Sequence, residues 1–173
     1  MYVIMVTDIK HTSGAKMNTT IILLEKTLIT GTYVVLNGEK ITDISLENAQ
    51  ISGCKYGNCT FKNVTFFNCD FQGSAISQTD FIDCKFINCN FSFTKIEECN
   101  FIACTIEGCL FSITNSLSCN FQSCTFINNN AENSLFTEKN FINTYLDDVS
   151  STQMKITNTS LVNASSYSLN MAA

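Results

Sequence analysis

The sequence lacks arginine, proline and tryptophan, and it holds a single histidine among 173 residues. All ten basic side chains are therefore lysines, which argues against direct nucleic-acid binding, because arginine leads the recognition of phosphates and base edges. Without proline every residue keeps its backbone N–H group, which suits an uninterrupted β ladder. Charged residues make up 14% of the chain, below the roughly 25% of a typical soluble domain.

Long apolar runs are also missing. No stretch of 18 or more apolar residues occurs, so the sequence predicts no transmembrane helix. The apolar content of 45% is enough for a core, and the length fits one domain. We interpret the net charge of −5 as ordinary solubility.

Large apolar residues recur at every fifth position from Ile41 to Leu161. Of the 25 positions in this register, only Ser116, Ala131 and Ser151 are not large and apolar, and 12 of the 14 phenylalanines lie here. All ten cysteines fall in a second register, two residues before the first. Two positions in every five therefore face inward, as on one face of a short strand.

A period of five excludes a single regular element. Five residues advance an α-helix by about 500°, so the apolar stripe would wind around it, and an odd step flips side chains to the other face of a flat strand. The chain must turn a corner every five residues, and four corners close a square coil of 20. Residues 20 apart are alike, most clearly Phe61, Phe81, Phe101, Phe121 and Phe141.

The sequence therefore predicts an all-β fold, a quadrilateral parallel β-helix (solenoid) of about six 20-residue coils stacked about 4.8 Å apart. One side should differ, because its column of Tyr56, Ile76 and Ile96 is poorer in phenylalanine and its partner register is nearly free of cysteine. We predict an N-terminal extension at residues 1–17, a β segment at 18–40 that caps the N-terminal end, the β-helix at 41–163 and a tail at 164–173.

The repeat unit resembles that of the pentapeptide repeat family, whose usual unit is a small residue, Asp or Asn, Leu or Phe, and two variable positions. The matching units include CDFQG, TDFID, CNFSF, CNFIA and CNFQS. The resemblance covers about residues 41–163 and implies a right-handed quadrilateral β-helix. This chain departs from the family by using Cys where Ala is commoner and Phe where Leu is commoner. Its stretch FFNCDFQG looks like segments of quinolone-resistance and microcin-immunity members, which protect DNA gyrase.

The cysteines do not show the spacing of a usual metal site. Their repeated C-x4-C pattern and the single His11 differ from zinc motifs, so we interpret them as small, buried, reduced apolar side chains. Ser74, Thr79, Thr94 and Val64 occupy the same register, which favours a size requirement. Metal binding by stacked thiols and disulfides between coils stay open as alternatives. Reduced cysteines favour a cytoplasmic protein, with secretion into a host cytosol as an alternative.

No catalytic constellation is evident in the sequence. His11 stands alone and the seven glycines are scattered, so neither a triad nor a phosphate-binding loop is indicated. The acid pairs Glu97–Glu98 and Asp147–Asp148 should point outward from a filled rod, whereas a glycosidase needs two carboxylates facing a groove. The prediction is a non-enzymatic protein with no catalytic residue, no metal site and no cofactor.

The residue after each central position should lie exposed near a corner. Most of these residues are polar, and the apolar ones lie on two consecutive sides. Exposed apolar stripes mark contact surfaces, although flanking residues could cover them, or β-branched residues could simply suit the corner. The predicted partner-contact residues are Phe67, Ile82, Ile87, Ile102, Ile127 and Ile142. The predicted structural core includes Phe61, Phe81, Phe101, Phe121, Phe141, Cys69, Cys89 and Cys109.

These patterns favour a rigid scaffold that mediates protein–protein interaction with an unidentified protein partner, as a monomer or an end-to-end dimer. The resemblance implies one alternative, a DNA mimic that protects DNA gyrase or topoisomerase. That function needs a two-fold dimer and a continuous acidic face, whereas residues 41–163 hold only 12 acidic residues against six lysines and the C-terminal segment shows no dimerising helix. A module of a secreted effector is a further alternative.

Overall fold

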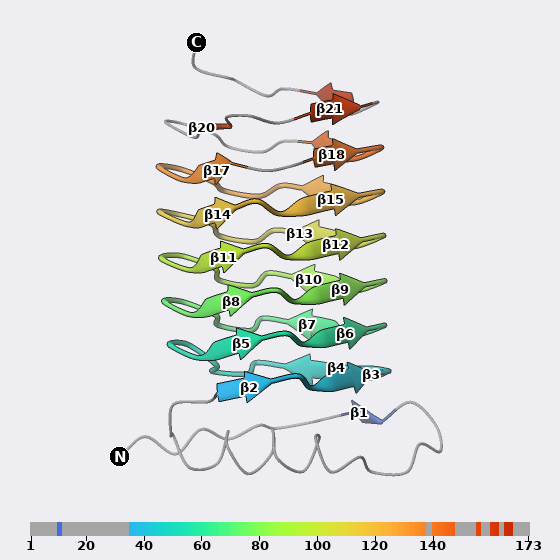
Figure 1. Ribbon diagram of the computed structural model, residues 1–173, viewed down its shortest axis with the longest axis vertical. Coiled ribbons are helices and arrows are strands. Elements are labelled where there is room, and N and C mark those ends of the chain that lie inside the picture. The colour runs from blue at the N-terminus through green and yellow to red at the C-terminus, as the bar shows by residue number, and fades with distance from the viewer. Residues whose placement is uncertain are drawn as a thin grey trace.

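The computed structural model is a four-sided β-solenoid in which each coil stacks on the one before (Figure 1). It describes residues 10–11, 35–137, 140–147, 155–156, 160–162 and 165–167, with the side chains of 35–137 and 142–145. Every described element is a strand, and the coil is right-handed (Figure 1). The predicted right-handed quadrilateral parallel β-helix is thus confirmed, with about five coils in the continuous stretch 35–137 and further strands of the same sheets beyond it.

Three sides of the coil are parallel sheets, named here in the order in which the chain passes them. The first side consists of β2 (Val35–Asn37), β5 (Lys55–Gly57), β8 (Ala75–Ser77), β11 (Lys95–Glu97), β14 (Asn115–Leu117), β17 (Leu135–Thr137) and β20 (Lys155–Ile156). The second side consists of β3 (Lys40–Thr42), β6 (Thr60–Lys62), β9 (Asp80–Ile82), β12 (Asn100–Ile102), β15 (Asn120–Gln122), β18 (Asn140–Ile142) and β21 (Ser160–Val162). The third side consists of β4 (Ile44–Glu47), β7 (Thr65–Phe67), β10 (Lys85–Ile87), β13 (Thr105–Glu107), β16 (Thr125–Ile127), β19 (Tyr145–Asp147) and β22 (Ser165–Tyr167).

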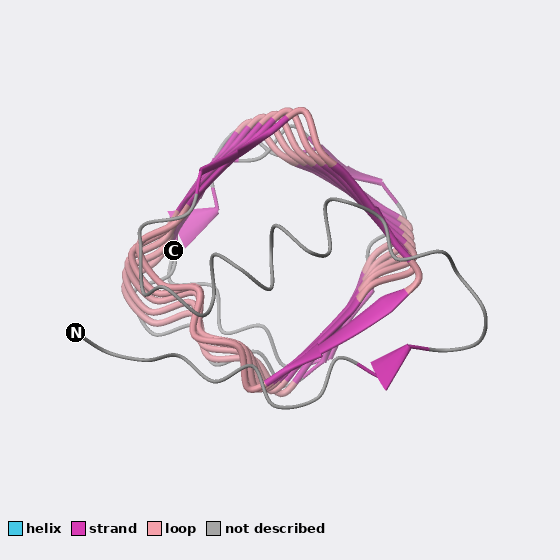
Figure 2. Ribbon diagram, turned by 90° about the horizontal axis from the view of Figure 1, so that it is seen from below, coloured by secondary structure: helices cyan, strands magenta, loops and turns pink. Residues whose placement is uncertain are grey.

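The fourth side is built differently. Figure 2, which looks along the solenoid, shows strands on three sides and loop on the fourth. Isolated bridges join Gln50, Asp70, Asn90, Leu110 and Asn130 in turn along this side, and further backbone hydrogen bonds, such as that from the Gly73 N–H to the Ser92 carbonyl at 3.0 Å, also connect its coils. On all four sides the paired residues are 20 apart, as the period-20 argument predicts.

A residue in the left-handed backbone region ends each side and turns the chain onto the next. In one coil these residues are Asn58, Asn63 and Asn68, each with a φ of 53°, and then Gly73 with a φ of 67°. Asparagine and glycine tolerate this conformation better than other residues do. The abundance of asparagine in the variable positions therefore reflects the corners that the five-residue unit must turn.

The corner after the fourth side is a tighter turn than the others. The Ser74 N–H donates to the Phe71 carbonyl at 3.0 Å, and Thr94 makes the same bond to Phe91 at 3.1 Å. Residues 71–74 therefore have the features of a type II turn, in which Phe71 is the first residue and Gly73, the third, has a positive φ. The side whose partner register holds only one cysteine, Cys54, is the one that follows this turn.

Phenylalanine columns fill the lumen. Along the second side, the ring centroids of Phe61 and Phe81 are 5.1 Å apart, and those of Phe81 and Phe101 are 4.9 Å apart, with nearly parallel planes. Rings on adjacent sides meet edge to face, as Phe61 and Phe66 do at 5.8 Å and 63°. Both arrangements are favourable for aromatic pairs. The central residues carry the apolar burial on which the coil depends.

The second inward register forms hydrogen bonds between coils. The Cys104 thiol donates to the Phe81 carbonyl at 3.3 Å, and the Thr94 hydroxyl donates to the Phe71 carbonyl at 2.9 Å. Such a side chain also accepts a backbone N–H from the coil below, as the Cys109 sulfur does from Cys89 at 3.4 Å. Interpreting the cysteines as apolar filler of the right size is therefore incomplete, because most positions in this register also supply a donor and an acceptor.

The solenoid extends beyond the predicted boundaries at both ends. β2 pairs in parallel with β5, and Leu36 is buried in the column of Tyr56, so residues 35–40 belong to the coil and not to the predicted cap at 18–40. β22 pairs in parallel with β19, which carries the ladder past residue 163 to Tyr167. At the N-terminal edge of the third side, β1 (Lys10–His11), which lies within the predicted N-terminal extension, pairs antiparallel with β4. The rest of the predicted cap, residues 18–34, lies outside the described residues.

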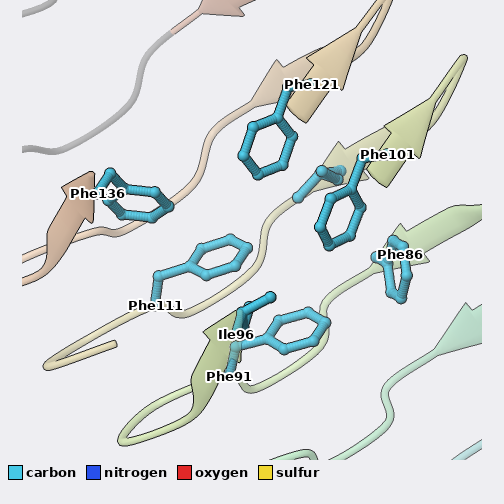
Figure 3. A pocket seen from close by; sticks show the side chains of 8 residues that line it. Phe86, Phe91, Ile96, Phe101, Phe111, Phe121 and Phe136 are labelled. Atoms are coloured by element: carbon cyan, nitrogen blue, oxygen red, sulfur yellow. The ribbon is translucent and has the colours of Figure 1, made fainter. Parts of the chain in front are cut away.

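Ser116 is a defect in the apolar column of the first side. It is fully buried between Ile96 and Phe136, and its hydroxyl has no hydrogen-bond partner among the described residues. Its two column neighbours help to line a void of about 10 Å³ within the phenylalanine core (Figure 3). An apolar lining of this size holds no ordered water.

We expect Ser116→Ala to raise the free energy of unfolding by about 1–2 kcal/mol, because it removes a buried hydroxyl without a partner. The matched control is Ser134→Ala. The Ser134 hydroxyl accepts the Thr114 N–H at 3.2 Å and donates to the Phe111 carbonyl, so this change should lower stability. Urea denaturation followed by circular dichroism measures both variants. The same sign for the two changes would contradict the account.

Candidate interaction surface

The interior offers no catalytic site within the described residues. The lumen is packed with phenylalanine, and no group of three or more His, Cys, Asp or Glu side chains there is placed to hold a metal ion. The neighbouring Cys89 thiol and burial raise the pKa of Cys69, and the Cys109 thiol likewise raises the pKa of Cys89. Thiols held in this way stay protonated and are poor nucleophiles.

All ten cysteines are free and buried. We expect them to react with 5,5′-dithiobis(2-nitrobenzoate) roughly 100-fold or more slowly in the native protein than in denaturant, where all ten should react. The measurement is the absorbance of the released thiolate with time. Rapid reaction of several thiols in the native protein would contradict a closed ladder.

The acidic side chains do not converge on a reaction site. Glu97 pairs with Lys95 at 2.9 Å, and Glu98 accepts a hydrogen bond from the Gln78 amide at 3.0 Å. The Glu97–Glu98 pair lies in a shallow groove at the corner between the first and second sides, which Ser77, Leu117 and Ser118 also line. The side chains of Asp147 and Asp148 lie outside the described ones.

Acidic residues are also spread over all sides. In the central coils of the described solenoid, each acidic residue has an uncharged residue above or below it in its column. Glu107 lies between Ile87 and Ile127, and Glu98 lies between Gln78 and Ser118. The Asn63 side-chain amide donates a hydrogen bond to the exposed Asp43 carboxylate at 2.9 Å, which lowers the pKa of that carboxyl and keeps it ionised. The part of the solenoid that the structure describes therefore carries no continuous acidic face.

The predicted contact residues form two columns on different sides. Ile82, Ile102 and Ile142 lie on the second side, with Gln122 between the last two. Phe67, Ile87 and Ile127 lie on the third side, with Glu107 between the last two. Phe67 is exposed and the five isoleucines are half-buried. Because consecutive five-residue units occupy consecutive sides, the two columns follow separate corners and do not form a single stripe.

The predicted core residues lie inside the solenoid wherever their side chains are described. The set of Phe61, Phe81, Phe101, Phe121, Cys69, Cys89 and Cys109 is buried. Phe141 occupies the next position of the same ladder, above Phe121, and its side chain lies outside the described ones.

A second group of exposed apolar side chains was not predicted. Phe93 and Ile113 lie one above the other at the corner between the fourth and first sides, and they are 56% and 52% exposed. Leu135 follows on the first side of the next coil, and Leu110 precedes Ile113 on the fourth side; both are exposed. These four residues, Phe93, Leu110, Ile113 and Leu135, are called the apolar edge below.

Backbone conformation sets Phe93 and Ile113 apart from their neighbours. Both have left-handed φ values, 59° and 57°, at a corner where the other coils use Gly53, Gly73 and Asn133. A side chain other than glycine or asparagine costs about 1–2 kcal/mol in this region, and a β-branched one is an outlier. The column of residues 53, 73, 93, 113 and 133 holds the sequence signal, since only its third and fourth members are large and apolar.

No described helix is long and apolar enough to cross a membrane. A comparison with curated proteins found no similar sequence. Solved structures resemble the chain at low identity. A pentapeptide repeat protein from the thylakoid lumen of Arabidopsis thaliana is 16% identical over 58% of this chain, with a TM-score of 0.49, and the chain spans 66% of that protein's length.

Two further structures cover more of the chain. A trypsin-treated variant of QnrB1, a plasmid-mediated fluoroquinolone resistance protein, is 20% identical over 76% of this chain and 72% of its own, with a TM-score of 0.37. HetL from the cyanobacterium Nostoc sp. strain PCC 7120, a pentapeptide repeat protein involved in heterocyst differentiation regulation, is 11% identical over 86% of this chain and 92% of its own, with a TM-score of 0.31. None of these likenesses bears on function.

The family comparison agrees with the coil geometry. The model of the Pentapeptide repeats family matches residues 44–81, 66–101 and 76–112, which together span 44–112. Throughout these residues, the five-residue unit turns at left-handed corners and stacks at a period of 20. The repeat unit, the four-sided solenoid and this match identify residues 44–112 as pentapeptide repeats.

Proposed function

We propose that the chain is a non-enzymatic rigid scaffold that binds a partner protein through apolar side chains on its outer surface. The observation that carries this proposal is the pair of apolar columns on the second and third sides. Outward positions elsewhere on these sides are mostly polar, so a column such as Ile82 and Ile102 departs from the pattern of a solvated surface.

The stacked coils supply the rigidity that a scaffold needs. Backbone groups near the corners, where the sheets are interrupted, form hydrogen bonds with the small polar side chains, as the Cys109 N–H does by donating to the Asn129 side-chain oxygen at 2.8 Å. Asparagine amides also bond between coils on the outer surface, where Asn120 donates to Asn100 at 2.8 Å. Hydrogen bonds inside the coil and on its outer surface together fix the positions of the side-chain columns. This rigidity lowers the entropic cost of binding a partner.

The alternative of a gyrase-protecting DNA mimic has less support. Such a mimic needs acidic side chains in a continuous row, and the described acids are dispersed over four sides. We expect micromolar protein to give no protection of gyrase supercoiling against a quinolone. Protection at that concentration would favour the mimic over the scaffold. A module of a secreted effector is also compatible with this surface. The free thiols support a reducing compartment, both for a cytoplasmic scaffold and for an effector in a host cytosol.

The test of the scaffold is the loss of a bound protein on changing the two columns. The column variant carries alanine at Ile82, Ile87, Ile102 and Ile127. The control variant carries alanine at Thr65, Thr105 and Thr125, which lie in an outward column of the third side. In a pull-down from the source cells, the wild type and the control should retain the same partner and the column variant should not. Retention of nothing by the wild type, or equal retention by both variants, would refute the proposal.

A further inference from the structure

We infer that the apolar edge is a second binding element, which inserts Phe93 and Ile113 into an apolar pocket of a partner protein. This inference rests on the proposed scaffold function and adds the place and the chemistry of one contact. Phe93 and Ile113 occupy consecutive coils of one corner, and the Phe93 N–H donates to the carbonyl of Ser112, the residue before Ile113, at 3.0 Å. The two side chains therefore project outward as neighbours from a fixed backbone.

The backbone at this corner shows that the two side chains are not required by the fold. The same corner is turned by Gly53, Gly73 and Asn133 in the other coils. The chain therefore accepts an unfavourable conformation at Phe93 and Ile113, and more than half of each side chain faces solvent. Strained residues of this kind gather where a structure binds something.

Charge around the apolar edge argues for an uncharged, apolar contact. The charged residues within three positions of the edge in sequence are Lys95, whose ammonium pairs with Glu97 at 2.9 Å, and the acids Glu107, Glu132 and Glu138. Lys155 is the ladder partner of Leu135 in the next coil. Cations are therefore not clustered around the edge. A phosphate, a nucleic acid or an anionic lipid surface needs a cluster of unpaired cations, which this edge does not present.

The convex shape and the small exposed area of the apolar edge favour a partner protein with a pocket over a second copy of this chain. The apolar edge is a convex corner of the solenoid, so its occupant must be concave. One groove of the described surface is lined by polar residues such as Gln78 and Glu98, which do not suit an apolar side chain. The four side chains expose on the order of 300 Å², given the roughly 150–250 Å² of a large side chain, whereas a stable interface buries about 800 Å² per partner. The edge therefore suits an anchor within a larger contact.

The edge variant Phe93→Asn/Ile113→Asn tests whether the two residues serve binding or folding. Asparagine is the residue of Asn133 in the same column, and it fits the left-handed region. The control variant is Ala103→Asn/Ser123→Asn, at another corner with φ values of 53° and 54°. We expect the melting temperature of the edge variant to equal or exceed that of the wild type. A fall in melting temperature that the control lacks would overturn the inference.

Photo-crosslinking identifies the occupant. Benzoylphenylalanine placed at Phe93 in the source cells should give one protein adduct, and the same probe at Ser123 should not. The peptide attached at Phe93 should map to an apolar pocket, and the purified partner should bind the edge variant at least roughly tenfold more weakly than the control, a difference of about 1.4 kcal/mol. An adduct of twice the chain mass, an adduct with lipid, no adduct, or equal binding of the edge and control variants would each overturn the inference.

The two proposals fail in different ways. If the purified partner binds the edge variant as it binds the wild type but does not bind the column variant, the apolar edge is not a contact and the scaffold function stands. If no protein is retained by the wild type, both proposals fail.

Discussion

Replacing Phe101 by Asp is expected to unfold the solenoid. The Phe101 ring is 4% exposed and stacks between Phe81 and Phe121, with centroid distances of 4.9 and 4.7 Å. An aspartate there would place a carboxylate among aromatic rings with no cation beside it, at a cost above about 4–5 kcal/mol. Phe101 lies near the middle of the described coils, so neither half is long enough to fold well without the other.

Phe101→Leu is the matched control, because it keeps an apolar side chain in the column. We expect it to cost about 1–2 kcal/mol and to leave the fold intact. Circular dichroism and limited proteolysis measure both variants. A folded, protease-resistant Phe101→Asp protein would refute the inward phenylalanine column.

Asn129→Leu should cause the second-largest loss of stability, about 2–4 kcal/mol. Asn129 is buried and follows Cys109 in the register that links the coils. Its amide donates to the Ile106 carbonyl at 2.9 Å, and its side-chain oxygen accepts the Cys109 N–H at 2.8 Å. Leucine has a similar volume but no polar atom, so it would bury the Cys109 N–H without this partner.

Asn129→Cys separates hydrogen bonding from size. Cysteine is smaller than asparagine, but it supplies a donor and an acceptor, as the Cys109 sulfur does by accepting the Cys89 N–H. We expect this variant to lose less than about 1 kcal/mol. Guanidinium denaturation curves for the two variants and the wild type make the comparison. Equal losses for leucine and cysteine would show that this register selects only for size.

The sequence predicts the fold well because one periodicity encodes it. Two inward positions in five fix the corners, and the likeness of Phe61, Phe81 and Phe101 fixes the coil at 20 residues. The period does not reveal what a small inward residue does, because Cys, Ser, Thr and Asn share both a small volume and hydrogen-bonding capacity. The structure resolves this ambiguity, because Cys104 and Thr94 donate hydrogen bonds to carbonyls of the coil below.

The candidate surfaces were predictable only in part. The apolar residues after the central positions, such as Phe67 and Ile87, can be identified in the sequence. Their separation into two columns on different sides becomes clear only when the structure shows where each corner lies. Phe93 and Ile113 were missed because they occupy the corner position itself, where the φ of the backbone decides what is unusual. A sequence pattern contains no φ value, so the conflict between side chain and backbone appears only in the structure.

The ends of the solenoid were also placed incorrectly, for a local reason. Leu36 is in phase with Ile41, but the sequence around it has the composition of an ordinary β segment and no phenylalanine or cysteine. The pairing of β2 with β5 assigns it to the first side. At the end of a repeat array, the structure of a weakly patterned unit is determined more by pairing with the neighbouring coil than by its own residues.

The central claim is that inward residues carry the fold and that the outward apolar residues serve contact. A protease-resistance scan of all single substitutions at residues 41–137 tests it most directly, because it measures folding without a partner. We predict intolerance at two positions in every five, with polar substitutions accepted at Phe67, Ile87, Phe93 and Ile113 as readily as at their polar neighbours. If polar substitutions at these four residues unfold the protein as those at Phe61 or Phe101 do, the outward apolar side chains are structural and the interaction surface is refuted.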